Sequence, residues 1–443
     1  MPTNFDSGRY RAVLLVFSLS ALGAAPPPLP GAIAADVSES FRLLSQSAYQ
    51  PVDQQTLLAA AADGLVAYAH KHNVTLEPAQ LRVQDDPDAT LADLDEAIAS
   101  AADSAHASPT DYAYAAIAAM AKSVGDRYTQ FFTPDEFKEF NSALDPERIS
   151  GIGVMIEPDP ATQLVRVLYV VPGTPAENSG LRVGDVFETI DGVSTKGLTV
   201  DAASKLLRGK AGTTVAIAVQ RTGSAPSLVE IKRQEVQPPT VVFRMLPGDI
   251  GYVYVIAFGK ATPSEFDTAV SRLKDEGAKA MILDLRNDGG GYVNSALLIS
   301  ERFIANKALL TVEERGQHAT TIQAENETSV AIPVSVLVNE YTASASEITA
   351  GALQDDGVGM LVGTKTFGKG VMQTLTPLPD GAAIKITTAH YLTPNHHDIN
   401  LRGIEPDVVV DEPHDSRLGV IDRDAQLRAA IILLQKKIAE AGR

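Results

Sequence analysis

The 443-residue chain contains no cysteine. This absence excludes disulfides, thiolate zinc sites, iron–sulfur clusters and a cysteine nucleophile, so any chemistry must rely on oxygen, nitrogen or carboxylate groups. Basic residues are also scarce beside acidic ones, since 37 lysines and arginines accompany 55 aspartates and glutamates, for a formal charge of −18. A field of that sign repels a phosphate backbone, so we expect no nucleic-acid partner.

An apolar segment near the N-terminus is too short to span a bilayer comfortably. It covers residues 12–25, follows Arg9 and Arg11, and precedes a proline cluster and the small residues Ala32-Ile33-Ala34. This order is typical of a secretory signal peptide. We therefore interpret residues 1–34 as a signal peptide cut after Ala34, which predicts a periplasmic or otherwise extracytoplasmic protein, the thylakoid lumen included, with no stable membrane span. An uncleaved N-terminal anchor is the alternative.

Residues 35–149 are alanine-rich, and their apolar positions recur at helical spacing. Residues 73–110 are acidic and interrupted by prolines, which favours a loop or a poorly packed helical insert. Thr133-Pro134 reads as the start of a helix, with threonine as the cap. The first region is therefore predicted to be helical, and a homodimer formed through the helical regions stays an open alternative.

The residue pattern of the rest of the chain changes twice, at about residue 150 and at about residue 240. Residues 150–235 combine short β-branched runs with glycines, which indicates a compact unit of strands with one or two helices. Residues 240–412 alternate strand and helix patterns, which predicts an α/β domain with a substantially parallel sheet, and residues 413–443 end in an amphipathic helix expected to pack on it. The strands expected in the α/β domain are 251–258, 280–285, 334–338, 360–363 and 384–389, and the helices are 263–276, 293–303 and 344–354.

Ser344 stands where a buried-looking strand gives way to a helix. Free backbone amides at a helix start favour an anion, which suits a nucleophile whose oxyanion needs stabilisation. Because Glu347 follows three residues later, the same serine also fits an ordinary capping box. Taken alone, the capping role is the simpler interpretation.

Two glycine-rich segments accompany this serine. Lys369 lies between Gly368 and Gly370, where burial would lower its pKa and make the amine a usable base, although a surface loop lysine is the default. Gln373 follows and is placed to orient the amine. The turn 284–291 exposes several amides as an oxyanion cradle or serves as a plain strand-to-helix turn; it matches neither a dinucleotide nor a phosphate-binding loop.

Together these segments resemble those of the carboxyl-terminal processing proteases, serine peptidases with a Ser–Lys dyad and an inserted PDZ domain. The resemblance covers essentially all of residues 115–412. The segments that carry it, in order, are Tyr128-Thr129-Gln130-Phe131-Phe132-Thr133-Pro134, Ser150-Gly151-Ile152-Gly153, Pro172-Gly173-Thr174-Pro175-Ala176, Gly180-Leu181-Arg182-Val183-Gly184-Asp185, Arg208-Gly209-Lys210-Ala211-Gly212, Asp284-Leu285-Arg286-Asn287, Ala343-Ser344-Ala345-Ser346-Glu347, Phe367-Gly368-Lys369-Gly370 and Gly403-Ile404-Glu405-Pro406-Asp407.

The resemblance implies a role for each matching residue. Ser344 corresponds to the nucleophile, Lys369 to the general base and Gln373 to a residue that supports the base. The oxyanion hole would use the amides of Ala345 and of Gly289 or Gly290, with the choice of glycine open, and Asp355 matches an aspartate of supporting role. No metal, nucleotide or other cofactor is implied.

Residues 150–235 resemble a PDZ domain, and residues 240–412 the Ser–Lys protease core. The loop Gly151-Ile152-Gly153-Val154 would bind the C-terminal carboxylate of a substrate while the groove accepts an added strand, and Arg208 would sense that carboxylate or couple the domains. The expected partners are protein substrates with exposed, apolar C-terminal tails.

Two other classes stay open beside an acyl-enzyme endopeptidase. One is a catalytically silent PDZ and protease-fold protein that only binds peptides. The other is a Ser–His protease that uses one of the eight histidines, such as His390, as its base. The adjacent pair His396-His397 lacks the helical spacing of a chelate, so no metal site is expected.

Overall fold

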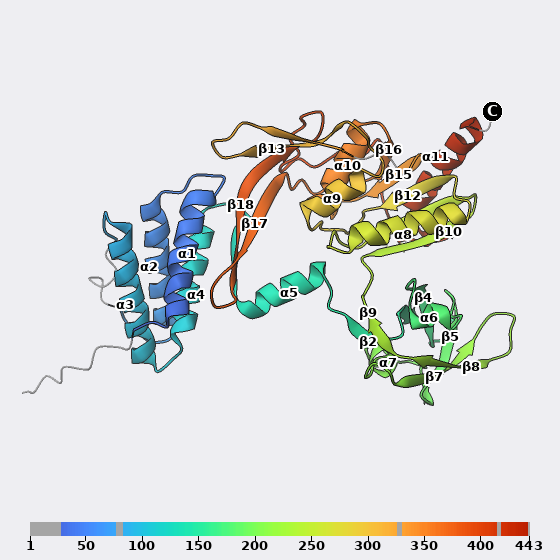
Figure 1. The fold of residues 1–443 in the computed structure, drawn as a ribbon, viewed down its shortest axis with the longest axis horizontal. Helices are drawn as coiled ribbons and strands as arrows, with labels where there is room; N and C mark the ends of the chain where they lie inside the picture. The colour runs from blue at the N-terminus through green and yellow to red at the C-terminus, as the bar shows by residue number, and fades with distance from the viewer. Residues whose placement is uncertain (1–27, 77–82, 326–329, 414–417, 442–443) are drawn as a thin grey trace, which may run out of the picture.

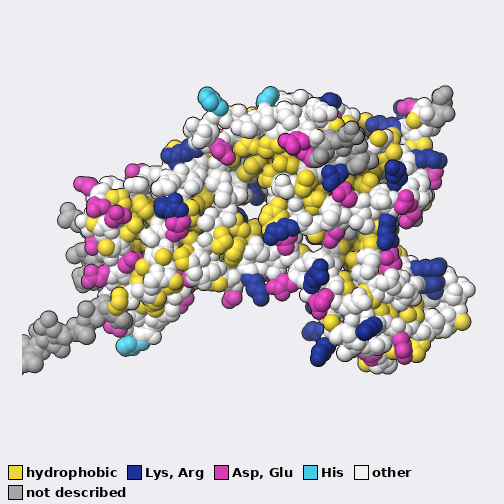
Figure 2. All heavy atoms as spheres, in the orientation of Figure 1, with side chains coloured by type: hydrophobic (Ala, Val, Ile, Leu, Met, Phe, Trp, Pro, Cys, Tyr) yellow, Lys and Arg dark blue, Asp and Glu magenta, His cyan; other side chains and the backbone are white. Residues whose placement is uncertain are grey.

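The structure is a computed structural model that describes residues 28–76, 83–325, 330–413 and 418–441. Figure 1 shows three parts: an N-terminal helical bundle, a large α/β core, and a smaller β-rich domain beside the core. In the described ranges, we find no helix that combines the length and the apolar character needed to cross a membrane. On the face shown in Figure 2, basic and acidic side chains intermingle over all three parts.

The bundle consists of α1 (Gly31–Ser47), α2 (Gln54–Lys71), α3 (Pro87–Ala105) and α4 (Pro109–Ser123). The expectation for residues 73–110 was a loop or a poorly packed helical insert, and α3 corrects it because this helix is well packed. Asp86 caps the helix by accepting from the Asp88 amide, Pro87 occupies the first position, and Leu94 and Ile98 are buried in the bundle core. The acidic residues that suggested a loop therefore belong to its cap and outer face.

The start of α1 bears on the proposed signal peptide. Residues 1–27 lie outside the described residues, but the helix already begins at Gly31, and Ile33 is buried in the bundle. Cleavage after Ala34 would therefore remove the first turn of this helix. The cleavage position stays a prediction.

A short strand and a helix connect the bundle to the rest of the chain. Strand β1 (Gln130–Phe132) is followed by α5 (Pro134–Leu144), which starts with the predicted Thr133 cap. The side chain of Thr133 accepts from the Glu136 amide, and the Glu136 carboxylate accepts from the Thr133 amide 2.9 Å away. This reciprocal capping involves only neighbouring residues, so it can be predicted from the sequence pattern alone.

The β-rich domain is built from one main sheet and a two-stranded neck. The neck pairs β2 (Ile149–Gly151) with β9 (Gln234–Val236), so the chain enters and leaves at the same place. The remaining elements are β3 (Val154–Pro158), β4 (Val165–Val170), α6 (Pro175–Asn178), β5 (Val186–Ile190), β6 (Val193–Ser194), α7 (Val200–Leu207), β7 (Thr214–Gln220) and β8 (Ser227–Lys232), with sheet order β3-β4-β5-β7-β8.

The core contains a six-stranded sheet in the order β10-β11-β12-β15-β16-β19. All neighbours from β11 onward are parallel, and only β10 is antiparallel. Its strands are β10 (Val241–Leu246), β11 (Ile250–Val255), β12 (Ala280–Asp284), β15 (Val334–Val338), β16 (Gly359–Gly363) and β19 (Val408–Val409), and its helices are α8 (Thr262–Asp275), α9 (Val293–Ser300), α10 (Ala345–Asp355) and α11 (Ala425–Ala441), the last preceded by the short turn Ile421–Arg423.

Helices cover both faces of this sheet. Val253 and Val336 face a core shared with α8, α9 and α10, whereas the alternate residues Tyr252 and Leu337 face α11. Because successive strand side chains point to opposite faces, a sheet buried on both sides needs continuous apolar runs, as these strands have. Leu434 of the C-terminal helix is buried against this second face.

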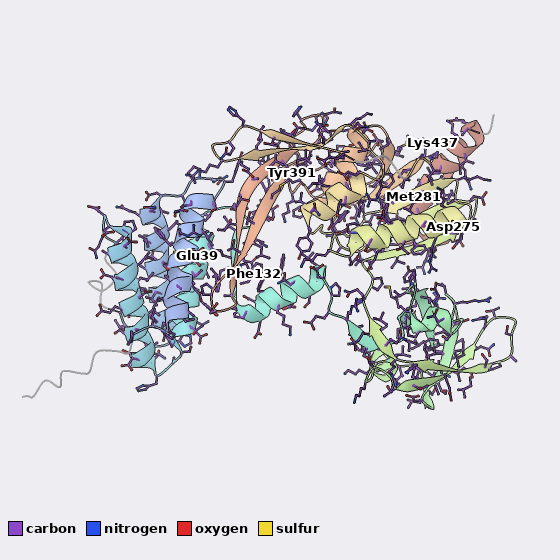
Figure 3. All side chains as sticks on the ribbon, viewed as in Figure 1. Glu39, Phe132, Asp275, Met281, Tyr391 and Lys437 are labelled. Atoms are coloured by element: carbon purple, nitrogen blue, oxygen red, sulfur yellow. The ribbon has the colours of Figure 1, made fainter. Side chains whose placement is uncertain are left out.

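A second, antiparallel sheet corrects part of the α/β interpretation. The expected strand 384–389 is β18 (Ala383–Leu392), which does not join the parallel sheet. It pairs with β13 (Ala308–Glu314), β17 (Val371–Pro377) and β1, and β13 also pairs with β14 (Thr320–Gln323). Strands joined by a short turn, as β17 and β18 are, can pair only antiparallel. Figure 3 places Phe132 where β1 meets this hairpin and Tyr391 farther along β18.

Candidate active site

Ser344 lies at the end of the loop that joins β15 to α10 and directly precedes the helix, as predicted. Hydrogen bonds to the segment after β12 anchor this loop. The Thr342 hydroxyl donates to the Leu285 carbonyl at 2.8 Å, and the Ala343 amide donates to the Asp288 carbonyl at 3.0 Å. Ser344 itself has φ 57° and ψ −117°, a backbone conformation that is unfavourable for a residue with a Cβ. Such strain in a well-anchored loop is typical of a functional site.

The predicted glycine turn lies directly against this serine. Gly290 has φ 94°, and a Cβ placed there would come 2.6 Å from the Ala343 carbonyl oxygen and 2.7 Å from the Ala345 amide nitrogen. Only glycine permits that approach. The Gly290 amide donates to Asp288 Oδ1 at 2.8 Å. In the described part of the chain, the amides of Gly289 and Ala345 donate to no protein acceptor.

Lys369 lies in the loop after β16, between two glycines that let the loop press against residues 399–403. A Cβ at Gly368 would come 2.7 Å from the Gly403 amide nitrogen, and one at Gly370 would come 2.8 Å from that of Asn400. This close approach leaves the lysine side chain only partly exposed, whereas the sequence left a buried base and a surface loop lysine both open. Burial and, to a smaller extent, the positive charge of Lys385 lower the pKa of Lys369 to about 8, against the opposing effect of Glu347.

The Lys369 ammonium lies over an aromatic ring. Its Nζ is 4.9 Å from the centroid of the Tyr128 ring, and a ring face stabilises a cation without accepting its proton. No role was predicted for Tyr128 from the sequence, although the residue belongs to one of the segments that carried the family resemblance. It arrives from the N-terminal region just before β1, far from Lys369 in sequence.

Glu347 joins the serine loop to the lysine loop. Its carboxylate is fully buried and accepts four hydrogen bonds: from the Ser344 amide at 2.9 Å, the Thr366 hydroxyl at 2.6 Å, the Gly368 amide at 2.7 Å and the Lys369 amide at 2.8 Å. The sequence pattern identified this residue only as the partner in a capping box. Its second set of donors, on the lysine loop, comes from a distant segment that no local pattern could reveal.

Tyr391 holds the same two residues from another side. Its hydroxyl donates to the Lys369 carbonyl oxygen at 2.6 Å and lies 3.2 Å from that of Ser344. The side chain is fully buried, and burial raises its pKa well above the usual value, so the phenol keeps its proton. Ser344 and Lys369 are thus coupled through their backbones by one carboxylate and one phenol.

Other predicted supporting residues lie near these loops without touching the two central side chains. In the described ranges, no hydrogen bond joins the Ser344 hydroxyl to the Lys369 amine, and the Gln373 amide donates to the Val371 carbonyl at 3.3 Å instead. Asp355 accepts from the Asn395 amide at 2.9 Å, which anchors the loop after β18 to the end of α10. Its contact supports a structural role.

The five residues predicted to bind a peptide tail line one pocket of about 190 Å³ in the β-rich domain. The pocket lies between β3 and α7, with Leu207 and Pro239 among its apolar walls. Gly153 has φ 89°, and a Cβ there would overlap Thr174 at 2.4 Å, so the loop conformation requires glycine. The predicted residues brought together are Gly151, Ile152, Gly153, Val154 and Arg208.

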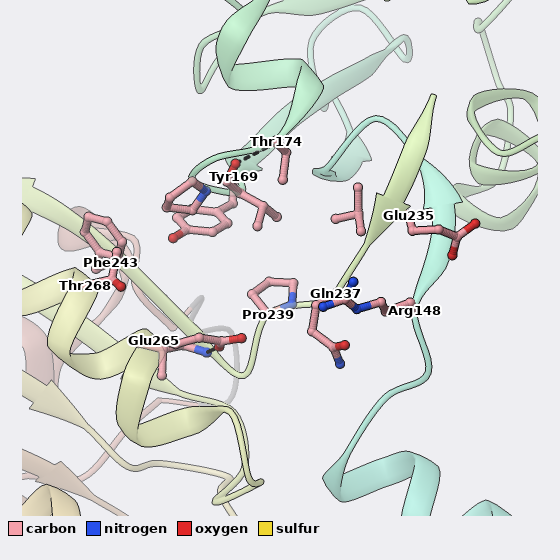
Figure 4. A pocket seen from close by; sticks show the side chains of 13 residues that line it. Arg148, Tyr169, Thr174, Glu235, Gln237, Pro239, Phe243, Glu265 and Thr268 are labelled. Atoms are coloured by element: carbon pink, nitrogen blue, oxygen red, sulfur yellow. Dashed lines mark hydrogen bonds between the residues drawn. The ribbon is translucent and has the colours of Figure 1, made fainter. Parts of the chain in front are cut away.

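A second pocket, of about 250 Å³, lies where this domain meets the core. Figure 4 shows Tyr169 on the side of the β-rich domain and Phe243 and Glu265 on the core side. Beside it, Arg272 of α8 forms an ion pair with Glu177 of α6 at 2.5 Å. These contacts link the two domains in the observed arrangement.

Comparison with known proteins follows the same division of the chain. Residues 249–410 match peptidase family S41, and residues 166–221 match a PDZ domain. A carboxyl-terminal-processing protease of Picosynechococcus sp. is 35% identical over 340 residues, which cover 75% of this chain and 81% of that protein. The chain belongs to this family. The carboxyl-terminal-processing protease of Synechocystis sp. is also 35% identical, over 334 residues that cover 74% of this chain and 78% of the relative.

Among solved structures, a photosystem II D1 C-terminal processing protease is 26% identical and covers 92% of this chain and 98% of its own, with a TM-score of 0.47. Membership of the carboxyl-terminal-processing protease family confirms the predicted resemblance and the fold class of N-terminal helices, PDZ domain and α/β core. The chain is accordingly a serine-type C-terminal processing peptidase with a PDZ domain, and its substrates are peptides.

Proposed function

We propose that this carboxyl-terminal-processing protease is an extracytoplasmic endopeptidase that works through a Ser344–Lys369 dyad and recognises apolar C-terminal tails through its PDZ domain. The observation that carries the dyad is the shared carboxylate of Glu347, which bonds to the backbone amides of both residues. The pKa of Lys369, lowered to about 8 by burial, gives a sizeable neutral fraction near neutral pH.

The proposed reaction is acyl transfer in two steps. The neutral amine of Lys369 takes the proton of the Ser344 hydroxyl, and the serine oxygen forms a bond to the carbonyl carbon of the substrate. The amides of Ala345 and Gly289 are free to stabilise the oxyanion. The protonated lysine then donates its proton to the leaving amine, and water releases the acyl group with the lysine again as base.

The surroundings of His390 support lysine over histidine as the base. Its Nδ1 lies 3.5 Å from Glu313 and its Nε2 3.2 Å from Asp398. The neighbouring residue Tyr391 points toward the carbonyls of Ser344 and Lys369. Because adjacent strand side chains point to opposite faces, His390 faces away from the serine.

The pocket between β3 and α7 supports the proposed recognition of a peptide tail. A peptide added beside β3 would obtain backbone hydrogen bonds, and the loop at Gly151 and Gly153 would receive its carboxylate. The apolar walls, which include Ile152 and Leu207, favour an apolar last residue. Arg208 is exposed at the rim, where it can interact with the carboxylate.

The test is cleavage of an unfolded protein that ends in an apolar tail, compared with the same protein carrying a charged tail. Ser344→Ala and Lys369→Ala are each expected to abolish cleavage, whereas Lys365→Ala, a matched change at an exposed lysine paired with Glu405, should leave it unchanged. Activity that survives in Lys369→Ala but is lost in His390→Ala would move the base to histidine. Tail binding without any cleavage by the wild type would favour a catalytically silent peptide-binding protein.

Location and assembly need separate measurements. The basic start, short apolar run and small residues of segment 1–34 support export, which cell fractionation with N-terminal sequencing of the mature protein would test. A homodimer through the helical regions would appear as a doubled mass in sedimentation equilibrium.

A further inference from the structure

Asp288 lies in the turn between β12 and α9 and is fully buried. Its Oδ1 accepts from the Gly290 amide at 2.8 Å, and its backbone carbonyl accepts from the Ala343 amide at 3.0 Å and the Ser346 hydroxyl at 3.1 Å. The residue therefore joins the glycine turn to the chain on both sides of Ser344. Its second carboxyl oxygen, Oδ2, is buried without a hydrogen-bond partner.

Because Asp288 lies beside the nucleophile, the charge of its carboxyl affects how well the oxyanion of the proposed reaction is stabilised. The glycine turn touches the nucleophile, because a Cβ at Gly290 would come 2.9 Å from the Cβ of Ser344. The oxyanion of the proposed reaction develops beside the same turn. A buried negative charge at Asp288 would oppose a second negative charge nearby, whereas a neutral carboxylic acid would not. The carbonyl oxygen of the neutral acid still accepts the Gly290 amide.

We propose that Asp288 is a positioning residue that holds the oxyanion turn through Gly290 and that it must be the neutral acid during turnover. This inference rests on the proposed dyad mechanism. Oδ1 has an amide donor while Oδ2 is buried without any partner, and this favours the neutral acid because an unpartnered hydroxyl costs far less to bury than an unpartnered charge.

The surrounding groups favour the neutral form. Burial raises the pKa of Asp288 to about 7, against the lowering effects of the Gly290 amide and of the nearby Ser346 hydroxyl. On β11, the neighbouring Tyr254 is a phenol whose own pKa is raised by burial and by the charges of Asp284 and Asp288. The nearby Arg286 is already engaged by Asp284 and Asp424, and no cation of the described residues forms an ion pair with Asp288.

Two ionisations then shape the pH dependence of cleavage. Activity rises with pH as Lys369 loses its proton, and it falls as Asp288 becomes charged above about pH 7. At pH 9, roughly 1% of a group with a pKa near 7 is still protonated. Asp288→Asn removes this alkaline loss. The ratio of kcat/KM for the variant to that for wild type is expected to increase at least about tenfold between pH 6 and pH 9.

The experiment measures kcat/KM from pH 5.5 to 9.5 for wild type, Asp288→Asn, Asp288→Ser and the exposed control Asp275→Asn on α8, which Figure 3 labels. Both changes at position 288 should flatten the alkaline limb, because each keeps an acceptor for Gly290 and carries no charge. Profiles parallel to wild type at every pH would overturn the inference. Cleavage that persists in Ser344→Ala would instead mean that the proposed dyad is wrong.

A direct titration keeps the inference testable if both variants fail to fold. Asp36 and Asp95, whose pKa values are also raised, to about 7 and about 6, are first replaced by asparagine. Carboxyl-carbon NMR of labelled aspartate in that protein should then show one group that titrates near pH 7. The absence of any aspartate titrating above pH 6.5 would overturn the neutral state of Asp288.

Discussion

Replacing Glu347 with glutamine tests the carboxylate that joins the serine and lysine loops. The wild-type carboxylate accepts four hydrogen bonds, from three backbone amides and one hydroxyl, while fully buried. Glutamine keeps one acceptor oxygen with two lone pairs and presents an NH₂ group where the other oxygen was. At least two of the four donors therefore lose their acceptor.

The structure sets the size of the effect. A hydrogen bond to a charged group contributes about 1.5–3 kcal/mol, so the loss of two costs about 3–6 kcal/mol in the free energy of unfolding. For domains of this size we expect Tm to fall by at least about 6 °C. Because both loops would shift relative to each other, kcat should fall by about 100-fold or more. The negative charge of Glu347 raises the pKa of Lys369, so the ascending limb of the pH profile should move to lower pH.

The assays are thermal unfolding and a pH series of kcat/KM. Glu340→Gln is the matched control, because Glu340 is exposed on the loop that carries Ser344, and its carboxylate accepts from the Thr364 hydroxyl at 3.2 Å. Wild-type Tm and kcat in the Glu347→Gln protein would refute the role of the Glu347 carboxylate in joining the serine and lysine loops. A pH midpoint displaced upward would refute the assigned electrostatic effect.

Three further substitutions test the surroundings of Lys369 and a buried carboxyl of the N-terminal bundle. Tyr391→Phe removes the hydroxyl that bonds to the Lys369 carbonyl and should lower kcat by about tenfold at unchanged KM; equal kcat would contradict its role. Lys385→Met removes a charge that lowers the pKa of Lys369, so the ascending limb should move to higher pH, and a downward shift would be inconsistent with this. Asp36 is buried near Asp380, and its folded pKa of about 7 lies above the ordinary 3.8, so the native state loses stability as pH rises from about 4 to 7. Asp36→Asn should therefore be more stable than wild type at pH 8 by about 1–2 kcal/mol after solvent screening, and equal to it near pH 4; urea unfolding at both values decides.

The local features of this protease could be predicted because they depend on neighbouring residues. Apolar periodicity indicated the strands and helices of the core, and the Thr133 cap was recognisable from four consecutive positions. Ser344 was placed at a helix start, and the glycines around Lys369 indicated close backbone contacts, both of which the structure contains. Helix α3 was expected only as a poorly packed alternative to a loop, because its acidic cap and prolines resemble a loop.

Features that depend on distant segments required the tertiary structure. The pKa of Lys369 is lowered by burial and by Lys385 on a strand of another sheet, and its ammonium lies over Tyr128 from the N-terminal region. Strand β18 joins the antiparallel sheet because β1 and β13, remote in sequence, supply its partners. The sequence by itself indicated the candidate catalytic residues and the elements that present them. Only the folded chain decided their protonation and mutual position, because burial and shared donors such as those of Glu347 arise from contacts that no local pattern contains.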